Sequence, residues 1–205
     1  ADTTVRAELM QLDLLSSSSP AASVVATRRK RKQHFDAGES SEWYTPAAYI
    51  EAARSAMGGI DLDPASCSLA NEVVRAARFF DRAANGLQQP WHGRVWLNPP
   101  YSDYMGQAAS WAAKLLAEYE AGRASQAIML VNLSTSYQPA MQSVASAGLV
   151  CMVSHRIRFY TAKGQAERPT QANVIYYLGE RRRQFVEAFK RFGVVLTPAV
   201  AEYGR

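Results

Sequence analysis

Between residues 41 and 153, short apolar runs alternate with longer stretches whose apolar residues recur every three or four positions. The short runs have the length and composition of buried strands, and the longer stretches have the period of a helix. The runs predicted as strands are Val95 to Leu97, Ala127 to Val131 and Leu149 to Val153. The stretches predicted as helices are 46–57, Met105 to Gly122 and Met141 to Gly148. This alternation is typical of an α/β fold with a doubly wound, mainly parallel sheet.

The last part of the chain changes rhythm. Arg156 to Tyr160 and Ala172 to Leu178 are two strand-like runs joined by a polar loop, and Gly193 to Leu196 is a third. Because strands linked in this way pair in opposite directions, we expect an antiparallel edge at the C-terminal side of the sheet. The loop from Thr161 to Gln171 contacts DNA or is an ordinary polar loop; its sequence is compatible with both.

Thr45 and Pro46 stand where the first predicted helix begins. Proline is common at the first helical position, and a threonine before it typically caps the helix. The Thr45 hydroxyl and the free N–H groups of the first turn could also hold a carboxylate. Capping alone explains the pair, and the sequence favours that interpretation.

The length of the chain and the distribution of its charges limit the possible domain organisation. The 205 residues suffice for one α/β domain and a tail. Residues 1–40 are rich in serine and small residues and contain the basic run Arg28 to Lys32, so we predict a flexible basic arm before a folded domain over 41–205. The arm either contacts nucleic-acid phosphates or only keeps the protein in solution. A net charge of +5 favours a polyanionic partner slightly.

Several classes of protein are disfavoured. No apolar run has the length that spans a bilayer, and the start lacks the apolar core of a signal peptide. Cys67 and Cys151 are far apart and the chain has three histidines, so neither a disulfide framework nor a metal site is predicted. We expect a protein of the reducing cytoplasm.

The tetrapeptide Asn98-Pro99-Pro100-Tyr101 follows a predicted buried strand. Each proline fixes its own φ and disfavours the helical region in the preceding residue, so the chain should leave the strand as a stiff, extended elbow. The prolines lack N–H groups, so the elbow presents carbonyl oxygens, the Asn98 amide and the ring of Tyr101. Such a site suits an amino group on a flat ring, although the tetrapeptide alone is equally compatible with an ordinary turn.

The chemistry for such an amine can be stated. The lone pair of an adenine or cytosine amine is delocalised into the ring, so the amine is a weak nucleophile. The Asn98 side-chain oxygen and the Pro99 carbonyl could each accept one N–H and favour a tetrahedral nitrogen that attacks a methyl sulfonium. Tyr101 would stack on the base, which must leave the duplex to be reached.

Asp63 ends the predicted strand that begins at Ile60. Ligands of open α/β sheets bind at this end of the strands, so Asp63 could bind the amino group of a cofactor. An Asx-turn that closes the strand explains the residue as well, and spacing alone favours it slightly. The glycine-rich loop of dinucleotide sites is absent, which argues against NAD or FAD.

Five short motifs together resemble the phage-type DNA N-6-adenine methyltransferases. The resemblance covers roughly Ser41 to Gly193. The motifs are Glu42-Trp43-Tyr44-Thr45-Pro46, Asp61-Leu62-Asp63-Pro64-Ala65-Ser66, Gly86-Leu87-Gln88-Gln89-Pro90-Trp91, Asn98-Pro99-Pro100-Tyr101 and Arg156-Ile157-Arg158-Phe159. The resemblance implies a Rossmann-like, S-adenosylmethionine-dependent, site-specific enzyme that methylates the adenine N6 amine of double-stranded DNA after base flipping. It makes 41–205 the catalytic domain, in a bacterial cell or a phage-infected host.

The resemblance also implies a role for each of several residues in catalysis, cofactor binding or DNA binding. These are Asn98, Pro99, Pro100 and Tyr101 as the catalytic tetrapeptide; Thr45, Pro46, Asp63, Pro64, Ala65 and Asn85 at the cofactor; and Tyr101, Phe159, Arg156 and Arg158 at the DNA substrate. Phe159 would be the second aromatic ring against the flipped base. Two positions depart from the pattern. No Gly-x-Gly follows Asp63, and Asn85 stands where related sequences often have Asp.

Other functions are compatible with the same residues. A methyltransferase acting on cytosine N4, on RNA or on a protein glutamine amide would need the same accommodation of a planar amine. A DNA-binding protein with a decayed cofactor site would explain the missing glycines and the basic arm. The target sequence and the oligomeric state have no signal in the chain.

Overall fold

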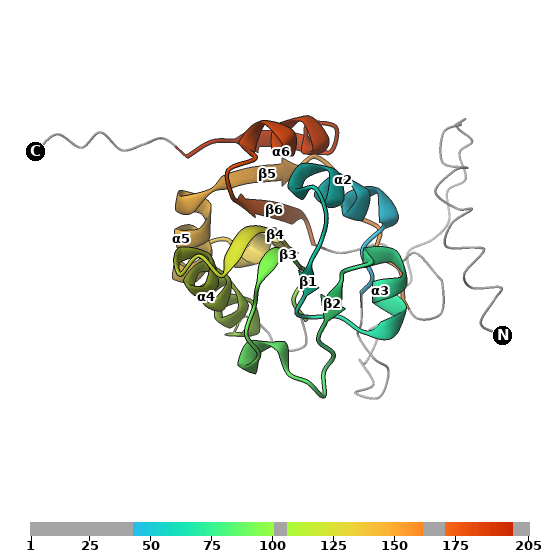
Figure 1. Ribbon diagram of the computed structural model, residues 1–205. Helices are drawn as coiled ribbons and strands as arrows, with labels where there is room; N and C mark the ends of the chain where they lie inside the picture. Colours follow the sequence, from blue (N-terminus) through green and yellow to red (C-terminus); the bar gives the residue numbers. More distant parts are fainter. Residues whose placement is uncertain (1–42, 101–105, 162–170, 199–205) are drawn as a thin grey trace, which may run out of the picture.

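The computed structural model describes residues 43–100, 106–161 and 171–198 (Figure 1). Within these ranges, seven strands form one sheet in the order β2-β1-β3-β4-β6-β5-β7. The strands are β1 (Leu62–Asp63), β2 (Arg78–Phe79), β3 (Gly93–Leu97), β4 (Ala124–Asn132), β5 (Leu149–Val153), β6 (Asn173–Leu178) and β7 (Gly193–Leu196). The helices are α2 (Ala47–Met57), α3 (Ser68–Val74), α4 (Gly106–Glu120), α5 (Pro139–Ala147) and α6 (Arg182–Phe189), with 3-10 turns η2 (Gly86–Gln88) and η3 (Leu133–Thr135).

The sheet has a parallel half and an antiparallel half. β2, β1, β3 and β4 are parallel neighbours. β6 is antiparallel to both β4 and β5, and β7 is antiparallel to β5 at the end of the sheet. The predicted fold class, an α/β fold with a mainly parallel core and an antiparallel C-terminal part, is confirmed. β6 lies between two strands, so all six of its residues are buried.

One predicted strand pairing is wrong. Arg156 to Tyr160 does not pair with β6; its only bridge among the described residues joins Tyr160 to Tyr44. The two residues exchange backbone hydrogen bonds of 2.8 and 3.0 Å. β6 instead fills the space between β4 and β5, because a strand with apolar side chains on both faces is more stable with both edges paired and both faces covered.

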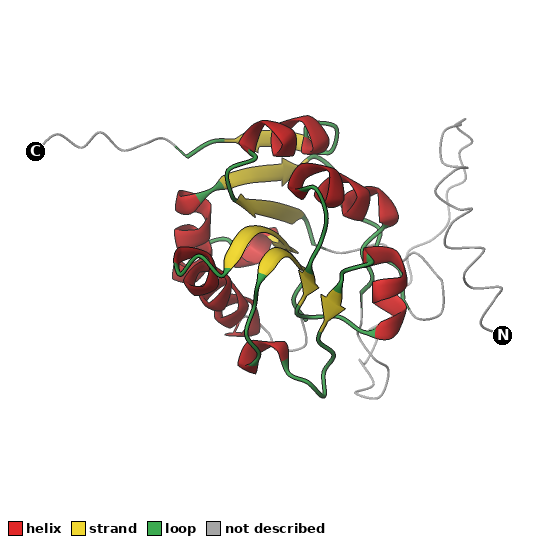
Figure 2. Ribbon diagram, viewed as in Figure 1, coloured by secondary structure: helices red, strands yellow, loops and turns green. Residues whose placement is uncertain are grey.

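Helices cover both faces of the sheet and create two cores (Figure 2). The first core contains side chains of α2 and α6 with Trp96, Leu130 and Ile175 from the strands. The second contains side chains of α4 and α5 with Leu97 and Val131. Because side chains of a strand point alternately to opposite faces, each strand residue can be assigned to the α2 side or the α4 side.

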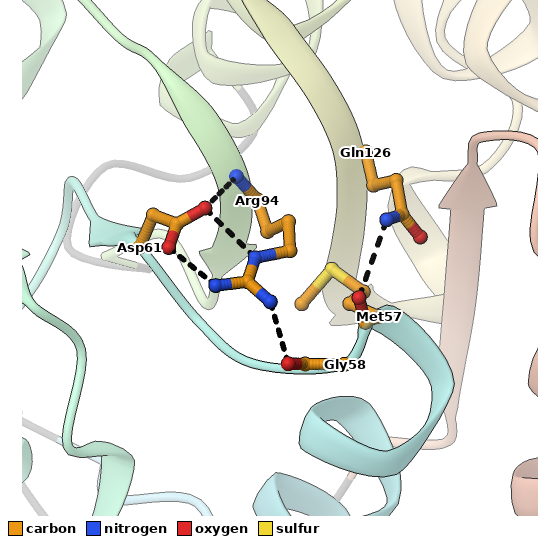
Figure 3. A network of polar contacts seen from close by, with 5 residues as sticks. All are labelled: Met57, Gly58, Asp61, Arg94 and Gln126. Atoms are coloured by element: carbon orange, nitrogen blue, oxygen red, sulfur yellow. Dashed lines mark hydrogen bonds and ion pairs between the residues drawn. The ribbon is translucent and has the colours of Figure 1, made fainter.

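Asp61 and Arg94 join the amino ends of β1 and β3 (Figure 3). Arg94 donates from its backbone N and its Nε to Asp61 Oδ2, both at 2.8 Å, and from Nη2 to Asp61 Oδ1 at 2.6 Å. Its Nη1 donates to the Gly58 carbonyl at 2.5 Å, at the end of α2. The guanidinium lowers the pKa of the Asp61 carboxyl. This network fixes the first helix against the first and third strands.

Candidate active site

Two predicted site residues lie at the carboxyl ends of neighbouring parallel strands. Asp63 is the last residue of β1, and Asn98 follows the last residue of β3. β1 and β3 pair through Leu62 and Val95, so both ends lie at the same edge of the sheet (Figure 1). Ligands of open α/β sheets bind at this edge. The structure therefore brings together the two motifs that the sequence separates by more than thirty positions.

The Asn98 amide is held from one side by the segment before α2. Its Nδ2 donates to the Trp43 carbonyl and to Thr45 Oγ1, each at 3.2 Å. The Trp43 carbonyl can only accept, so it identifies the nitrogen end of the amide, and Oδ1 is directed away from residues 43–45. An acceptor oxygen in a defined direction is what the predicted amine chemistry requires.

Thr45 has a different role from the predicted helix cap. The N-cap of α2 is Pro46, and no side chain caps the helix. Thr45 is buried and its hydroxyl accepts from Asn98, 53 positions away. The capping interpretation is therefore wrong: the helix begins one residue later than predicted, and the Thr45 hydroxyl pairs with the Asn98 amide instead of with the first turn. No periodicity or spacing in the sequence signals this contact.

The segment that holds Asn98 is itself fixed by two others. The Tyr44–Tyr160 bridge ties it to the chain after β5, and the Cys67 thiol lies 3.8 Å from the Tyr44 hydroxyl. The sequence did not identify Trp43 and Tyr160 as supports of the site. Both act through backbone groups, for which the sequence carries no signal.

Only part of the predicted catalytic tetrapeptide can be placed. Pro99 is buried and Pro100 is exposed. Tyr101 lies outside the described residues. So do the arm over 1–40 and most of the loop from Thr161 to Gln171.

Asp63 is a buried carboxyl, with a relative exposure of 3%. Burial raises its pKa to about 7, and the Ala65 N–H and the Ser66 hydroxyl offset the rise only in part. The Ala65 N–H donates to Oδ1 at 3.2 Å, so the Asx-turn suggested by the sequence is present. No basic side chain of the described residues contributes to the pKa. A buried carboxyl in this environment suits a cationic group brought by a ligand.

The Asn85-Gly86 turn packs directly on the loop after Asp63. A Cβ added at Gly86 would lie 1.9 Å from the Pro64 carbonyl oxygen, so only glycine allows this approach. The buried Trp91 indole donates to the Gly86 carbonyl at 2.8 Å and holds the turn. Asn85 is exposed, with φ +50°. Two predicted cofactor elements, Asp63 to Ala65 and Asn85, are thus adjacent.

The segment that contains Phe159 is extended, and its side chains alternate between the core and solvent. Ile157 and Phe159 are buried in the core on the α2 side, and Arg156 and Arg158 are exposed. Phe159 is only 4% exposed. Its ring belongs to the core on the α2 side, so stacking of Phe159 on a base stays a prediction and would require the segment to move. The two arginines face outward together, as a contact to phosphates requires.

Two kinds of feature are absent from the part of the chain that the structure describes. It contains no group of three or more metal-binding side chains. None of its helices has the length and hydropathy of a membrane span.

Comparison with known proteins agrees with this arrangement of motifs. A search of curated proteins gives no match. The family model described as DNA N-6-adenine-methyltransferase (Dam) matches residues 32–204, which is most of the chain and includes every predicted site residue. The sheet, with its acidic residue at the end of β1 and its Asn-Pro-Pro elbow after β3, fits a methyltransferase. The chain therefore belongs to the DNA N-6-adenine-methyltransferase (Dam) family.

Proposed function

We propose that this protein transfers a methyl group from S-adenosylmethionine to the N6 amine of adenine in double-stranded DNA, at a specific site and with the target base rotated out of the helix. The observation that carries the proposal is the fixed Asn98 amide. Its nitrogen is engaged by Trp43 and Thr45, so its oxygen is oriented before any substrate binds. A preorganised acceptor is worth most when charge develops on the amine.

The chain's own residues hold the amine. Asn98 Oδ1 and the Pro99 carbonyl each accept one N–H, which favours a tetrahedral nitrogen and frees its lone pair. S-adenosylmethionine, when bound, supplies a methyl group on a sulfonium as the electrophile. The nitrogen then carries a positive charge, and its extra proton passes to water because a methylated aryl ammonium is acidic. Tyr101 would stack on the flipped base.

The cofactor is proposed to bind between the β1 and β3 ends. A buried carboxyl without a basic partner among the described residues fits the ammonium of the methionine part, so Asp63 is the proposed ligand. The hydroxyl of Thr45 accepts from Asn98 and keeps its own hydrogen for the methionine carboxylate, close to Pro46. Pro64, Ala65 and Asn85 line the remainder, because the Gly86 turn rests on Pro64.

DNA is proposed to lie over the same edge. Arg156 and Arg158 are exposed next to the segment that supports Asn98, and phosphates are the natural partners of such arginines. The family match takes up residues 32–204 of the chain, so base contacts are proposed to come from loops at this edge.

One experiment tests the proposal. The full-length protein is incubated with unmethylated duplex DNA and isotope-labelled S-adenosylmethionine, and the nucleosides are identified by mass spectrometry. Labelled N6-methyladenine, lost in Asn98→Ala, supports the proposal. Labelled N4-methylcytosine would move the target to cytosine. No transfer, together with no cofactor binding by calorimetry, would indicate a DNA-binding protein instead.

A further inference from the structure

Three asparagines lie at one edge of the sheet and on one face of it. Asn98 follows Trp96 by two positions, Asn132 follows Leu130 by two, and Asn173 precedes Ile175 by two. Trp96, Leu130 and Ile175 all point into the core on the α2 side. Because strand side chains alternate between faces, the three asparagines share that side. The bonds from Asn98 to residues 43 and 45, before α2, agree with this placement.

Asn132 and Asn173 are a cross-strand pair at the end of β4 and the start of β6. Asn173 Nδ2 donates to Asn132 Oδ1 at 3.3 Å and to the Val131 carbonyl at 3.4 Å. The Val131 carbonyl can only accept, which fixes the nitrogen end of Asn173. The oxygen of Asn132 is thereby engaged, and its Nδ2 is turned away from Asn173.

The ordinary explanations do not account for this pair. Asn132 is the N-cap of η3, a position where asparagine normally caps, but its side chain makes no capping bond. Asn173 is 1% exposed, and its Oδ1 is buried without a partner in the structure. An unpaired buried acceptor typically costs about 1–3 kcal/mol, a cost that an apolar residue of similar size avoids. The unpaired Asn173 oxygen is therefore a cost to the fold that helix capping does not explain.

The ends of the amides that face the site are complementary. Asn98 directs an oxygen and Asn132 directs a nitrogen. In register Leu97 pairs with Met129, so Asn98 is level with Leu130 and Asn132 is its diagonal neighbour on the next strand. Strand spacing and rise place such residues roughly 8 Å apart at Cα, a span that two short amide side chains and one base edge fill. Asn132 is half-buried, so a base can reach it.

We propose that Asn132 donates a hydrogen bond from Nδ2 to the ring nitrogen beside the target amine, and that Asn173 is a positioning residue that keeps the Asn132 amide in this orientation. The acceptor of Asn98 and the donor of Asn132 then read an amine next to an unprotonated ring nitrogen, which in adenine is N1. This inference rests on the proposed function, because it names how the same site recognises its base.

The test compares adenine with 1-deazaadenine, in which a C–H replaces N1 and the amine remains. The target sequence is first found by mapping methylated positions in DNA treated with the wild-type protein. Duplexes with either base at that position are then methylated under single-turnover conditions. The readout is the ratio of the two rates in each variant, which cancels the intrinsic difference between the two amines.

Asn132→Leu should lower the preference for adenine on the order of 3- to 10-fold relative to wild type, the loss expected for one hydrogen bond. Ser125→Leu is the matched control, because Ser125 is an exposed polar residue at the opposite end of the same strand, and its ratio should not change. Asn132→Asp, which keeps the size but replaces the donor with an acceptor, should lower the preference at least as much. An unchanged ratio in a folded Asn132 variant, or loss of all turnover in Asn132→Leu, would overturn the inference.

Asn173→Leu separates positioning from packing. Removal of an unpaired buried acceptor should leave Tm unchanged or raise it, and the preference for adenine should fall as the Asn132 amide loses its orientation. A lower Tm with an unchanged preference would show that Asn173 is only a packing residue. If adenine is methylated but the ratio of the two rates is the same in every variant, this inference fails and the proposed function stands. If no base is methylated, the proposed function itself fails.

Discussion

The two ends of strand β1 carry the same residue type in opposite environments. Asp61, at the amino end, is half-exposed and bonded to Arg94, which lowers its pKa. Asp63, at the carboxyl end, is buried without a basic partner among the described residues, and burial raises its pKa to about 7. The amino end is thus electrostatically satisfied and the carboxyl end is not. Perturbed and incompletely paired polar groups are common at functional sites, so we propose that the amino end serves stability and the carboxyl end serves chemistry.

The largest effect is expected at the carboxyl end, in Asn98→Ala. The variant should lower kcat by about 100-fold or more, the typical result of removing one preorganised polar partner, with Tm and cofactor affinity nearly unchanged. Thr45→Val should have a smaller effect on kcat, because Asn98 keeps its bond to the Trp43 carbonyl, and Thr45→Ser should restore the rate. Steady-state kinetics and thermal unfolding measure both. A strongly lowered Tm in Asn98→Ala would assign Asn98 to stability and erase the contrast between the two ends.

Asp63→Asn should weaken S-adenosylmethionine binding by about 10- to 100-fold, as expected for the loss of a charged hydrogen bond. Calorimetry measures the Kd. Asp61→Asn is the matched control at the other end of the strand, and its Kd should equal that of the wild type. Equal losses in both variants would show that the Asp63 carboxyl does not touch the cofactor.

The pH dependence of stability should have opposite sign at the two aspartates. The pKa of Asp63 in the folded state, about 7, lies above its ordinary value of 3.8, so the folded state holds the proton more tightly. The contribution of Asp63 to the free energy of unfolding therefore falls as pH rises from about 4 to 7. Since one pKa unit corresponds to about 1.4 kcal/mol, the full change is a few kcal/mol. The pKa of Asp61 in the folded state is lowered from 3.8, so its contribution to the free energy of unfolding is present above pH 4 and is lost as pH falls below 4.

Urea unfolding of the cofactor-free protein from pH 3 to pH 8 tests these signs. Asp63→Asn should flatten the curve between pH 4 and 7, and Asp61→Asn should flatten it only below pH 4. An unchanged curve above pH 4 in Asp63→Asn would mean that the Asp63 carboxyl does not titrate in that range.

Arg94→Gln should act on stability alone. The ion pair is partly exposed, so removal of this pair together with the bond to the Gly58 carbonyl should lower the free energy of unfolding by about 1–2 kcal/mol. The folded variant should keep the wild-type kcat and Kd, because Arg94 is at the far end of β3. A changed kcat in protein that remains folded would show that the two ends of the strand are coupled.

The smallest effect is expected for the exposed arginines beside the site. Arg156→Ala with Arg158→Ala should weaken DNA binding on all sequences alike and lower the slope of log K against log salt by about 0.9 for each phosphate that the variant no longer binds. Arg182→Ala with Arg183→Ala, two exposed arginines on α6, is the matched control and should keep the slope. A changed target sequence in the first variant would show that these arginines read bases instead of phosphates.

The sequence by itself determined the types of secondary-structure element and the candidate functional groups. Apolar runs and helical periods predicted the α/β sheet and the first helix, which the structure places at Ala47–Met57. The prolines after Asn98 predicted an elbow at a strand end, because the restrictions that proline imposes are local.

Tertiary structure decided which of these local features meet. β6 inserts between β4 and β5, a choice that depends on burial of whole strands and not on the order of the runs. Thr45 orients Asn98 across 53 positions instead of capping its helix, and Phe159 packs into a core where the sequence suggested a base contact. The environments of Asp61 and Asp63 differ for the same reason. Hydrogen bonds and burial depend on neighbours in space, and two residues that look alike in the chain acquire different neighbours only when it folds.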